Sequence, residues 1–190
     1  QELMRHADIA LYQGKNQGRD KAMIFCAEMA AEVEQRREVE VELHAALEAK
    51  ELKLHYQPLI SCADGRVTGV EALLRWKHPT KGDISPGVFV PIAEEAGLMP
   101  ALGAFVIERA FEEAKAWPDL EVSINLSPVQ FRHVDLVELL ESLLKKYDID
   151  PSRIVFEVTE GVLMESSDRN RQILEHVRSM GFKIALDDFG

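Results

Sequence analysis

Two hydrophobic periods alternate along residues 51–190. Short runs rich in β-branched residues predict strands, and longer segments with an apolar residue every three or four positions predict helices. We expect strands at Leu52–Leu59, Arg66–Trp76, Leu120–Leu126, Ile154–Thr159 and Phe182–Leu186. We expect a helix pair within Pro86–Trp117, then helices at Asp135–Tyr147 and Ser167–Met180, the last ended by Gly181. This order predicts an α/β fold with a parallel sheet, either doubly wound or closed into a barrel.

The first 50 residues follow a different pattern. Residues 1–25 predict a helix, a turn at Gln17–Arg19 and a short strand at Ala22–Phe25. Glu28–Lys50 contains neither glycine nor proline, which favours one long helix or two abutting ones. We therefore expect an N-terminal segment (1–27), a helical linker (28–50) and a main domain (51–190).

Composition and charge limit the kinds of binding partner that we expect. The 190 residues are 46% hydrophobic, enough to bury a core, and their formal net charge of −11 argues against DNA or RNA binding, which requires a basic face. No apolar stretch approaches the roughly 20 residues of a membrane-spanning helix, and the N-terminus lacks a signal peptide. We expect a cytoplasmic segment without membrane contact. Both ends interrupt a pattern, so we also expect a longer parent chain, in which a membrane anchor elsewhere stays possible.

Hard oxygen donors interrupt or follow four of the apolar strand runs. Strands of a parallel barrel are buried on both faces, so a polar residue within one needs a partner or a purpose. Strand ends of one polarity gather at one rim of a barrel, where active sites lie. We therefore expect five residues to converge, namely Glu71, Asn125, Glu157, Asp187 and Asp188.

An oxygen set without Cys or His suits Mg²⁺ or Mn²⁺ better than zinc. The adjacent Asp187 and Asp188 can reach two ions, with Asp187 bridging both, and close carboxylates repel one another without cations. Two alternatives stay open: each acid caps a helix or pairs with a base, or two of them act as acid and base on a glycoside. Phosphoryl hydrolysis with two metals uses the whole set, and we favour it.

Five motifs then carry a family resemblance: Tyr56-Gln57-Pro58, Glu71-Ala72-Leu73, Ser123-Ile124-Asn125-Leu126-Ser127, Phe156-Glu157-Val158-Thr159-Glu160 and Asp187-Asp188-Phe189-Gly190. Over about residues 41–190 the chain resembles the EAL domain of cyclic-di-GMP signalling. The resemblance implies a (β/α)8 TIM-like barrel, incomplete in this chain. It also implies a metal-dependent phosphodiesterase that hydrolyses cyclic-di-GMP to linear pGpG in bacterial second-messenger signalling.

The resemblance implies residue roles as well. One metal would be held by Glu71, Asn125, Glu157 and Asp187, and the second by Asp187 and Asp188. Glu71, Asp187 and Asp188 would be catalytic, and Glu160 would steady the loop after the aspartate pair.

Substrate contacts are implied for Gln57, Arg75 and Asn125. The fork of Arg75 suits a phosphate, although an ordinary surface ion pair is the alternative for this residue. The family's catalytic lysine, a further metal-binding glutamate and a guanine-contacting glutamine follow the last motif, so the 190-residue chain alone is expected to be an incomplete enzyme.

Residues 1–27 resemble the C-terminal end of a GGDEF domain, through Ala7-Asp8, Ala10-Leu11-Tyr12, Lys15 and Gly18-Arg19. This implies a tandem GGDEF–EAL parent, which we expect to form a homodimer. Two alternatives stay open: a catalytically inactive EAL domain that acts as a cyclic-di-GMP receptor, or a regulatory dimerisation module.

Overall fold

The computed structural model describes residues 2–16, 22–49, 51–133, 136–159, 161 and 168–187. It divides into two compact units, residues 1–45 and 46–190, which are treated separately below. No helix in the described ranges is long and apolar enough to cross a membrane.

The first unit contains helix α1 (Glu2–Asn16) and most of helix α2 (Ala27–Glu48). The long segment predicted as one or two helices is thus a single helix. The strand predicted at Ala22–Phe25 is wrong, since residues 22–26 form no strand. An extended segment needs a neighbouring strand to accept and donate its backbone hydrogen bonds, and the described part of this unit has none. The turn predicted at 17–19 lies outside the described residues.

The second unit is built on a six-stranded mixed sheet of order β1-β2-β4-β5-β6, with β3 paired to β2. Its strands are β1 (Leu52–Ile60), β2 (Val67–His78), β3 (Gly82–Ile84), β4 (Glu121–Leu126), β5 (Ile154–Thr159) and β6 (Lys183–Asp187). Strands β2, β4, β5 and β6 run parallel, whereas β1 and β3 run antiparallel to β2.

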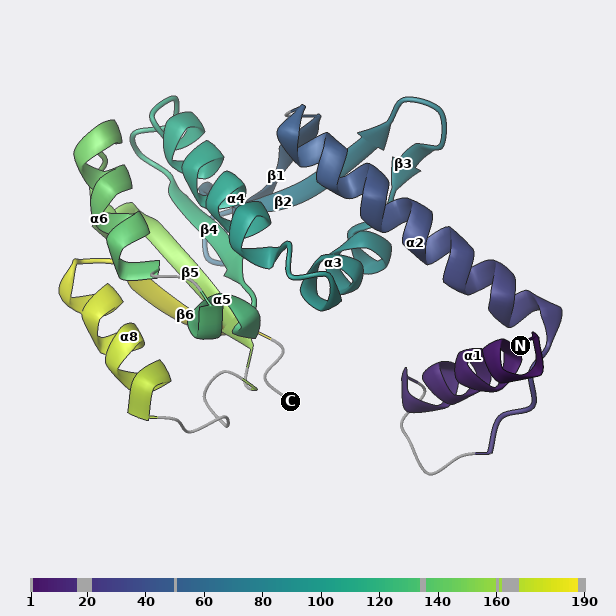
Figure 1. Ribbon diagram of the computed structural model, residues 1–190. Helices are drawn as coiled ribbons and strands as arrows, with labels where there is room; N and C mark the ends of the chain where they lie inside the picture. Colours follow the sequence, from purple (N-terminus) through teal and green to yellow (C-terminus); the bar gives the residue numbers. More distant parts are fainter. Residues whose placement is uncertain are drawn as a thin grey trace. The chain divides into compact units, whose positions relative to one another are not determined.

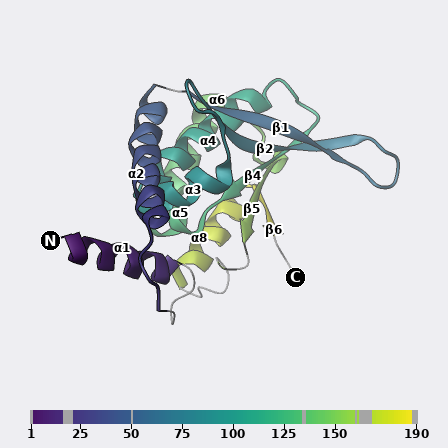
Figure 2. The same cartoon turned by 90° about the vertical axis from the view of Figure 1, so that its right-hand side faces the viewer.

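The five predicted strands are confirmed to within two residues at each end. The sheet predicted as parallel is mixed, because β1 and β3 run antiparallel to β2. A short turn joins β1 to β2, and a parallel pair would require a crossover of a dozen or more residues. Figure 2 shows these two strands extending as a hairpin past the rest of the sheet. Strand β3 was not predicted, because three residues are too few for a readable period.

Helices cover one face of this sheet. They are α3 (Pro86–Glu95), α4 (Met99–Ala114), α5 (Pro128–His133), α6 (Leu136–Tyr147) and α8 (Asp168–Ser179), with a 3₁₀ turn, η1, at Pro151–Arg153. Figure 1 shows α4, α6 and α8 over the same side of β4, β5 and β6. Each parallel strand neighbours the next along the chain, and the connecting helices share one face. That winding is typical of a barrel, because a doubly wound sheet carries helices on both faces. The described strands form an open sheet.

The main core lies between the sheet and these helices. Val122, Ile124 and Leu126 of β4 are 0–4% exposed, and Phe156 of β5 is fully buried. Phe156 meets Phe182 edge to face, with ring centroids 5.1 Å apart. Since side chains alternate along a strand, the residues between these apolar ones project from the opposite, helix-free face. Packing of the apolar side chains against the helices therefore determines which side chains lie on the helix-free face.

Candidate functional site

Polar side chains from neighbouring strands form rows across the helix-free face. Gln57 of β1 pairs with Glu71 of β2, and Glu71 pairs with Ser123 of β4. One step further along, Asn125 of β4 pairs with Glu157 of β5. Paired residues project from the same face. The face therefore carries four of the predicted site residues in adjacent rows.

Asp187 extends this group of polar residues to strand β6. It is the last residue of β6 and pairs with Thr159 of β5, two positions beyond Glu157. Two further predicted site residues, Asp188 and Glu160, lie outside the described residues.

A direct contact joins the first two predicted ligands. The Nδ2 of Asn125 donates a hydrogen bond to Oε1 of Glu71 at 2.9 Å, across 54 positions of sequence. A carboxylate can only accept, so this bond determines which side of the amide faces Glu71. The amide oxygen of Asn125 is consequently directed away from Glu71.

Two carboxylates act electrostatically on a third, Glu157. The pKa of Glu157 is raised, first by its burial and further by the negative charges of Glu71 and Asp187. A hydrogen bond from the Ser123 side chain opposes that rise. Acids from β2, β5 and β6 therefore lie close enough to disfavour ionisation of the central one.

The donor chemistry of these residues fits a hard divalent cation. Carboxylate and amide oxygens are the ligands that Mg²⁺ and Mn²⁺ prefer, and a cation would relieve the repulsion felt by Glu157. Within the described ranges, no three His, Cys, Asp or Glu side chains are gathered tightly enough to hold an ion by themselves. Asn125 is not among those residue types, and Asp188 lies outside these ranges.

A cavity of about 320 Å³ opens beside this group. Arg75, Asn125, Glu157 and Thr159 line it from the strands. Its other walls include Glu94 of α3 and mostly apolar residues of α3 and α4, namely Val90, Met99, Leu102, Gly103 and Val106. The half-buried Arg75 uses one guanidinium N–H on the carbonyl of Leu74, at 2.9 Å. A mostly apolar cavity with a few convergent polar groups is typical of an organic ligand site.

Sequence reasoning assigned no function to Glu94, Ser127 or Gln130. The structure places all three on the wall of this cavity. Ser127 donates from Oγ to Oε1 of Glu94 at 2.6 Å, and its own backbone N–H donates to Oε1 of Gln130 at 2.9 Å. The S-x-x-Q spacing of Ser127 and Gln130 is a readable helix-start signal. The contact with Glu94 has no such local signal.

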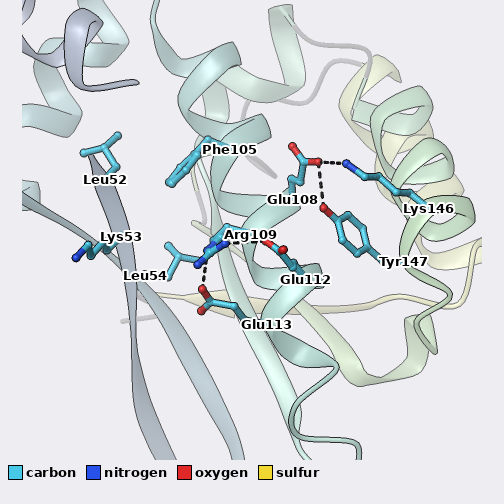
Figure 3. A pocket seen from close by; sticks show the side chains of 10 residues that line it. All are labelled: Leu52, Lys53, Leu54, Phe105, Glu108, Arg109, Glu112, Glu113, Lys146 and Tyr147. Atoms are coloured by element: carbon cyan, nitrogen blue, oxygen red, sulfur yellow. Dashed lines mark hydrogen bonds and ion pairs between the residues drawn. The ribbon is translucent and has the colours of Figure 1, made fainter. Parts of the chain in front are cut away.

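A second cavity, of about 680 Å³, lies beside β1 and helices α4 and α6 (Figure 3). Its charged residues are three acids and three bases, but they pair largely with each other. Lys146 contacts Glu108 at 2.6 Å, and Arg109 contacts Glu113 at 2.6 Å. The hydroxyl of Tyr147 also donates to Glu108, at 3.1 Å. This cavity contains none of the predicted site residues.

Comparisons with known proteins identify the family of this chain. Residues 40–190 match the model of the EAL domain. The chain is 40% identical over 194 residues to the bifunctional diguanylate cyclase/cyclic di-GMP phosphodiesterase MucR of Pseudomonas aeruginosa, covering 100% of this chain and 28% of MucR. The chain thus spans about a quarter of the length of the curated relatives it matches.

Two solved structures support the same family assignment. The PaMucR phosphodiesterase in complex with c-di-GMP has a TM-score of 0.76 and 40% identity, covering 80% of this chain and 64% of that one. The calcium/cy-diGMP complex of Klebsiella pneumoniae BlrP1 has a TM-score of 0.60 and 31% identity, covering 74% and 35%. Family match, sequence identity and fold together confirm the EAL resemblance, and the chain belongs to the EAL domain family.

Proposed function

We propose that this chain is part of a metal-dependent phosphodiesterase domain that hydrolyses cyclic-di-GMP to linear pGpG. The observation that carries the proposal is the acidic group on the helix-free face, where burial and, to a smaller extent, the charges of Glu71 and Asp187 raise the pKa of Glu157. Such crowding costs stability unless a cation offsets it. The relationship to MucR, whose name includes cyclic di-GMP phosphodiesterase, supports the choice of substrate.

We assign the cations, Mg²⁺ or Mn²⁺, to Glu71, Asn125, Glu157 and Asp187, with Asp188 completing a two-ion site. The chemistry that bound divalent ions supply in such sites is activation of a water and stabilisation of the leaving oxygen. The described residues contribute the oxygen donors and their orientation. Asn125 faces Glu71 through its Nδ2, which leaves its carbonyl oxygen available as a neutral donor.

Substrate binding is assigned to Gln57, Arg75 and Asn125. Arg75 lines the 320 Å³ cavity, and its bond to Leu74 uses only one of the five guanidinium N–H groups. Paired charge-assisted hydrogen bonds from the remaining donors suit a phosphodiester. Gln57 lies beside Glu71 in the β1–β2 register, within the same row.

The wider assembly is proposed on the same basis. The connected parallel strands and their one-sided helices support closure into a TIM-like barrel in the complete domain. The match to MucR extends over the whole chain, and its name includes diguanylate cyclase, which supports a GGDEF origin for residues 1–27. A cytoplasmic homodimer remains part of this proposal.

The direct test is hydrolysis by the full-length protein. Incubated with cyclic-di-GMP and Mg²⁺ or Mn²⁺, it should yield pGpG, resolved by ion-exchange chromatography, and Glu71→Ala should abolish the product. Glu175→Ala is the matched control, because Glu175 is an exposed acid on α8. Tight binding of the dinucleotide without product would favour the receptor function instead. Absence of both binding and product would refute the proposal.

A further inference from the structure

The connection that follows β4 is a short helix whose start is closed by reciprocal hydrogen bonds. Ser127 precedes α5, and its Oγ accepts from the backbone N–H of Val129 at 3.3 Å. In return, the side chain of Gln130 accepts from the backbone N–H of Ser127 at 2.9 Å. Pro128 occupies the first helical position, where no N–H is required. This arrangement is a variant of the capping box in which the Ser127 hydroxyl bonds the second helical residue, and it determines where the strand ends and the helix begins.

Two other helices hold this capping box in place. Glu94 of α3 accepts from the Ser127 hydroxyl at 2.6 Å. Gln130 is only 3% exposed and lies against α4, where a Cβ at Gly103 would come within 2.1 Å of its Nε2. Because a carboxylate accepts only, Glu94 forces the Ser127 hydroxyl to donate, and an oxygen lone pair is left for Val129.

This network is connected to the proposed metal site through two residues of backbone. Ser127 follows Asn125 by two positions, and Asn125, Ser127, Gln130 and Glu94 all line the 320 Å³ cavity. Asn125 in turn donates to Glu71. Hydrogen bonds and one short stretch of chain therefore connect Glu94 on α3 to Glu71 on β2.

We propose that Glu94, acting through Ser127, is a positioning residue for the metal site. It holds the end of β4 so that the Asn125 amide directs its nitrogen to Glu71 and its oxygen toward the cation. The inference rests on the proposed function for the identity of the site, and it assigns to Glu94 no contact with the metal or the substrate. Residues that hydrogen-bond a metal ligand directly typically influence metal affinity by about 10- to 100-fold, and because Glu94 acts through Ser127 we expect an effect at the lower end of that range.

The test is the Mn²⁺ dissociation constant of the full-length protein, measured by calorimetry and by electron paramagnetic resonance. Glu94→Ala and Ser127→Ala are each expected to raise it about tenfold. The double variant should bind Mn²⁺ about as weakly as either single one, because both changes break the same bond. Ser127→Thr keeps the hydroxyl and should restore near-normal affinity. Glu94→Gln keeps the size of the side chain and should show a smaller rise, about threefold, since charge-assisted bonds are about twice as strong as neutral ones.

Matched controls separate positioning from stability. Ser142→Ala and Glu175→Ala remove an exposed serine and an exposed glutamate from α6 and α8 and should leave Mn²⁺ affinity unchanged. The thermal midpoint is recorded for every variant. If Glu94→Ala and Ser127→Ala lower the midpoint but bind Mn²⁺ normally, the network is only structural and the inference is wrong. Hydrolysis of cyclic-di-GMP by the wild-type protein is assayed separately. If the wild-type protein is inactive but Glu94→Ala and Ser127→Ala weaken Mn²⁺ binding, the proposed substrate is contradicted while the role of Glu94 is supported.

Discussion

Two cavities described above for the second unit differ in how their acidic residues are partnered. In the 680 Å³ cavity beside β1, Glu108 pairs with Lys146, and Glu113 pairs with Arg109. On the wall of the 320 Å³ cavity, Glu157 accepts from the Ser123 side chain, and Asn125 donates to Glu71, which lies beside the cavity. Acids with basic partners stabilise a surface. Glu71 and Glu157 have neutral hydrogen-bond partners and lie near other acids, an arrangement whose repulsion a cation would relieve. Cavity size is therefore the poorer guide to function.

The largest effect is expected where that charge is removed. Glu157→Gln should lower phosphodiesterase activity about 100-fold or more, because a metal-binding carboxylate is lost. In metal-free protein, the same change should leave the thermal midpoint unchanged or higher, since burial and the charges of Glu71 and Asp187 disfavour ionised Glu157. Turnover assays and thermal melts check both parts. Glu112→Gln, in the other cavity, is the control, and comparable loss of activity in that variant would erase the distinction between the cavities.

Metal binding itself should separate the two cavities. Saturating Mn²⁺, at about 100 times its dissociation constant, should stabilise the wild-type protein by about 2.7 kcal/mol. Glu71→Ala should lose most of that gain, whereas Glu108→Gln should keep it. Thermal melts with and without a chelator measure the difference. Equal stabilisation of both variants would place the ion elsewhere.

A packing change tests how firmly α4 supports the smaller cavity. Gly103→Ala places a methyl group 2.1 Å from Nε2 of the buried Gln130, so we expect a loss of about 1–3 kcal/mol in the free energy of unfolding. Gly87→Ala is the matched control, because its nearest neighbour would be the Ser85 hydroxyl at 3.7 Å. Denaturant melts of both variants provide the measurement. If Gly103→Ala leaves the free energy of unfolding unchanged, Gln130 is not held against α4.

The smallest effect is expected in the 680 Å³ cavity, where the charged residues pair largely with one another. Glu108→Gln weakens exposed contacts with Lys146 and Tyr147, and such pairs contribute at most about 1 kcal/mol. Phosphodiesterase activity should be unchanged within error. A large loss of activity in this variant would reveal a function for the second cavity that its paired charges do not suggest.

Much of the second unit was readable from local patterns. Strands β1, β2, β4, β5 and β6 have clear apolar periods, and Gly181, with a φ of 99°, ends the last helical segment as expected. The failures occurred where local pattern is not decisive. Residues 22–26 have strand composition but no neighbouring strand in the described part of their unit. The six-residue α5 is too short to show a helical period.

The sequence by itself determined which residues alternate with the core. Once Ile124 and Phe156 face the helices, the period of a strand places Asn125 and Glu157 on the opposite face, and the EAL motifs identified the same positions. Tertiary structure decided the contacts between distant residues. The bond between Glu94 and Ser127 crosses 33 positions, and the bond between Asn125 and Glu71 crosses 54. No local period encodes such distances, because they depend on how α3 and β2 pack around the end of β4.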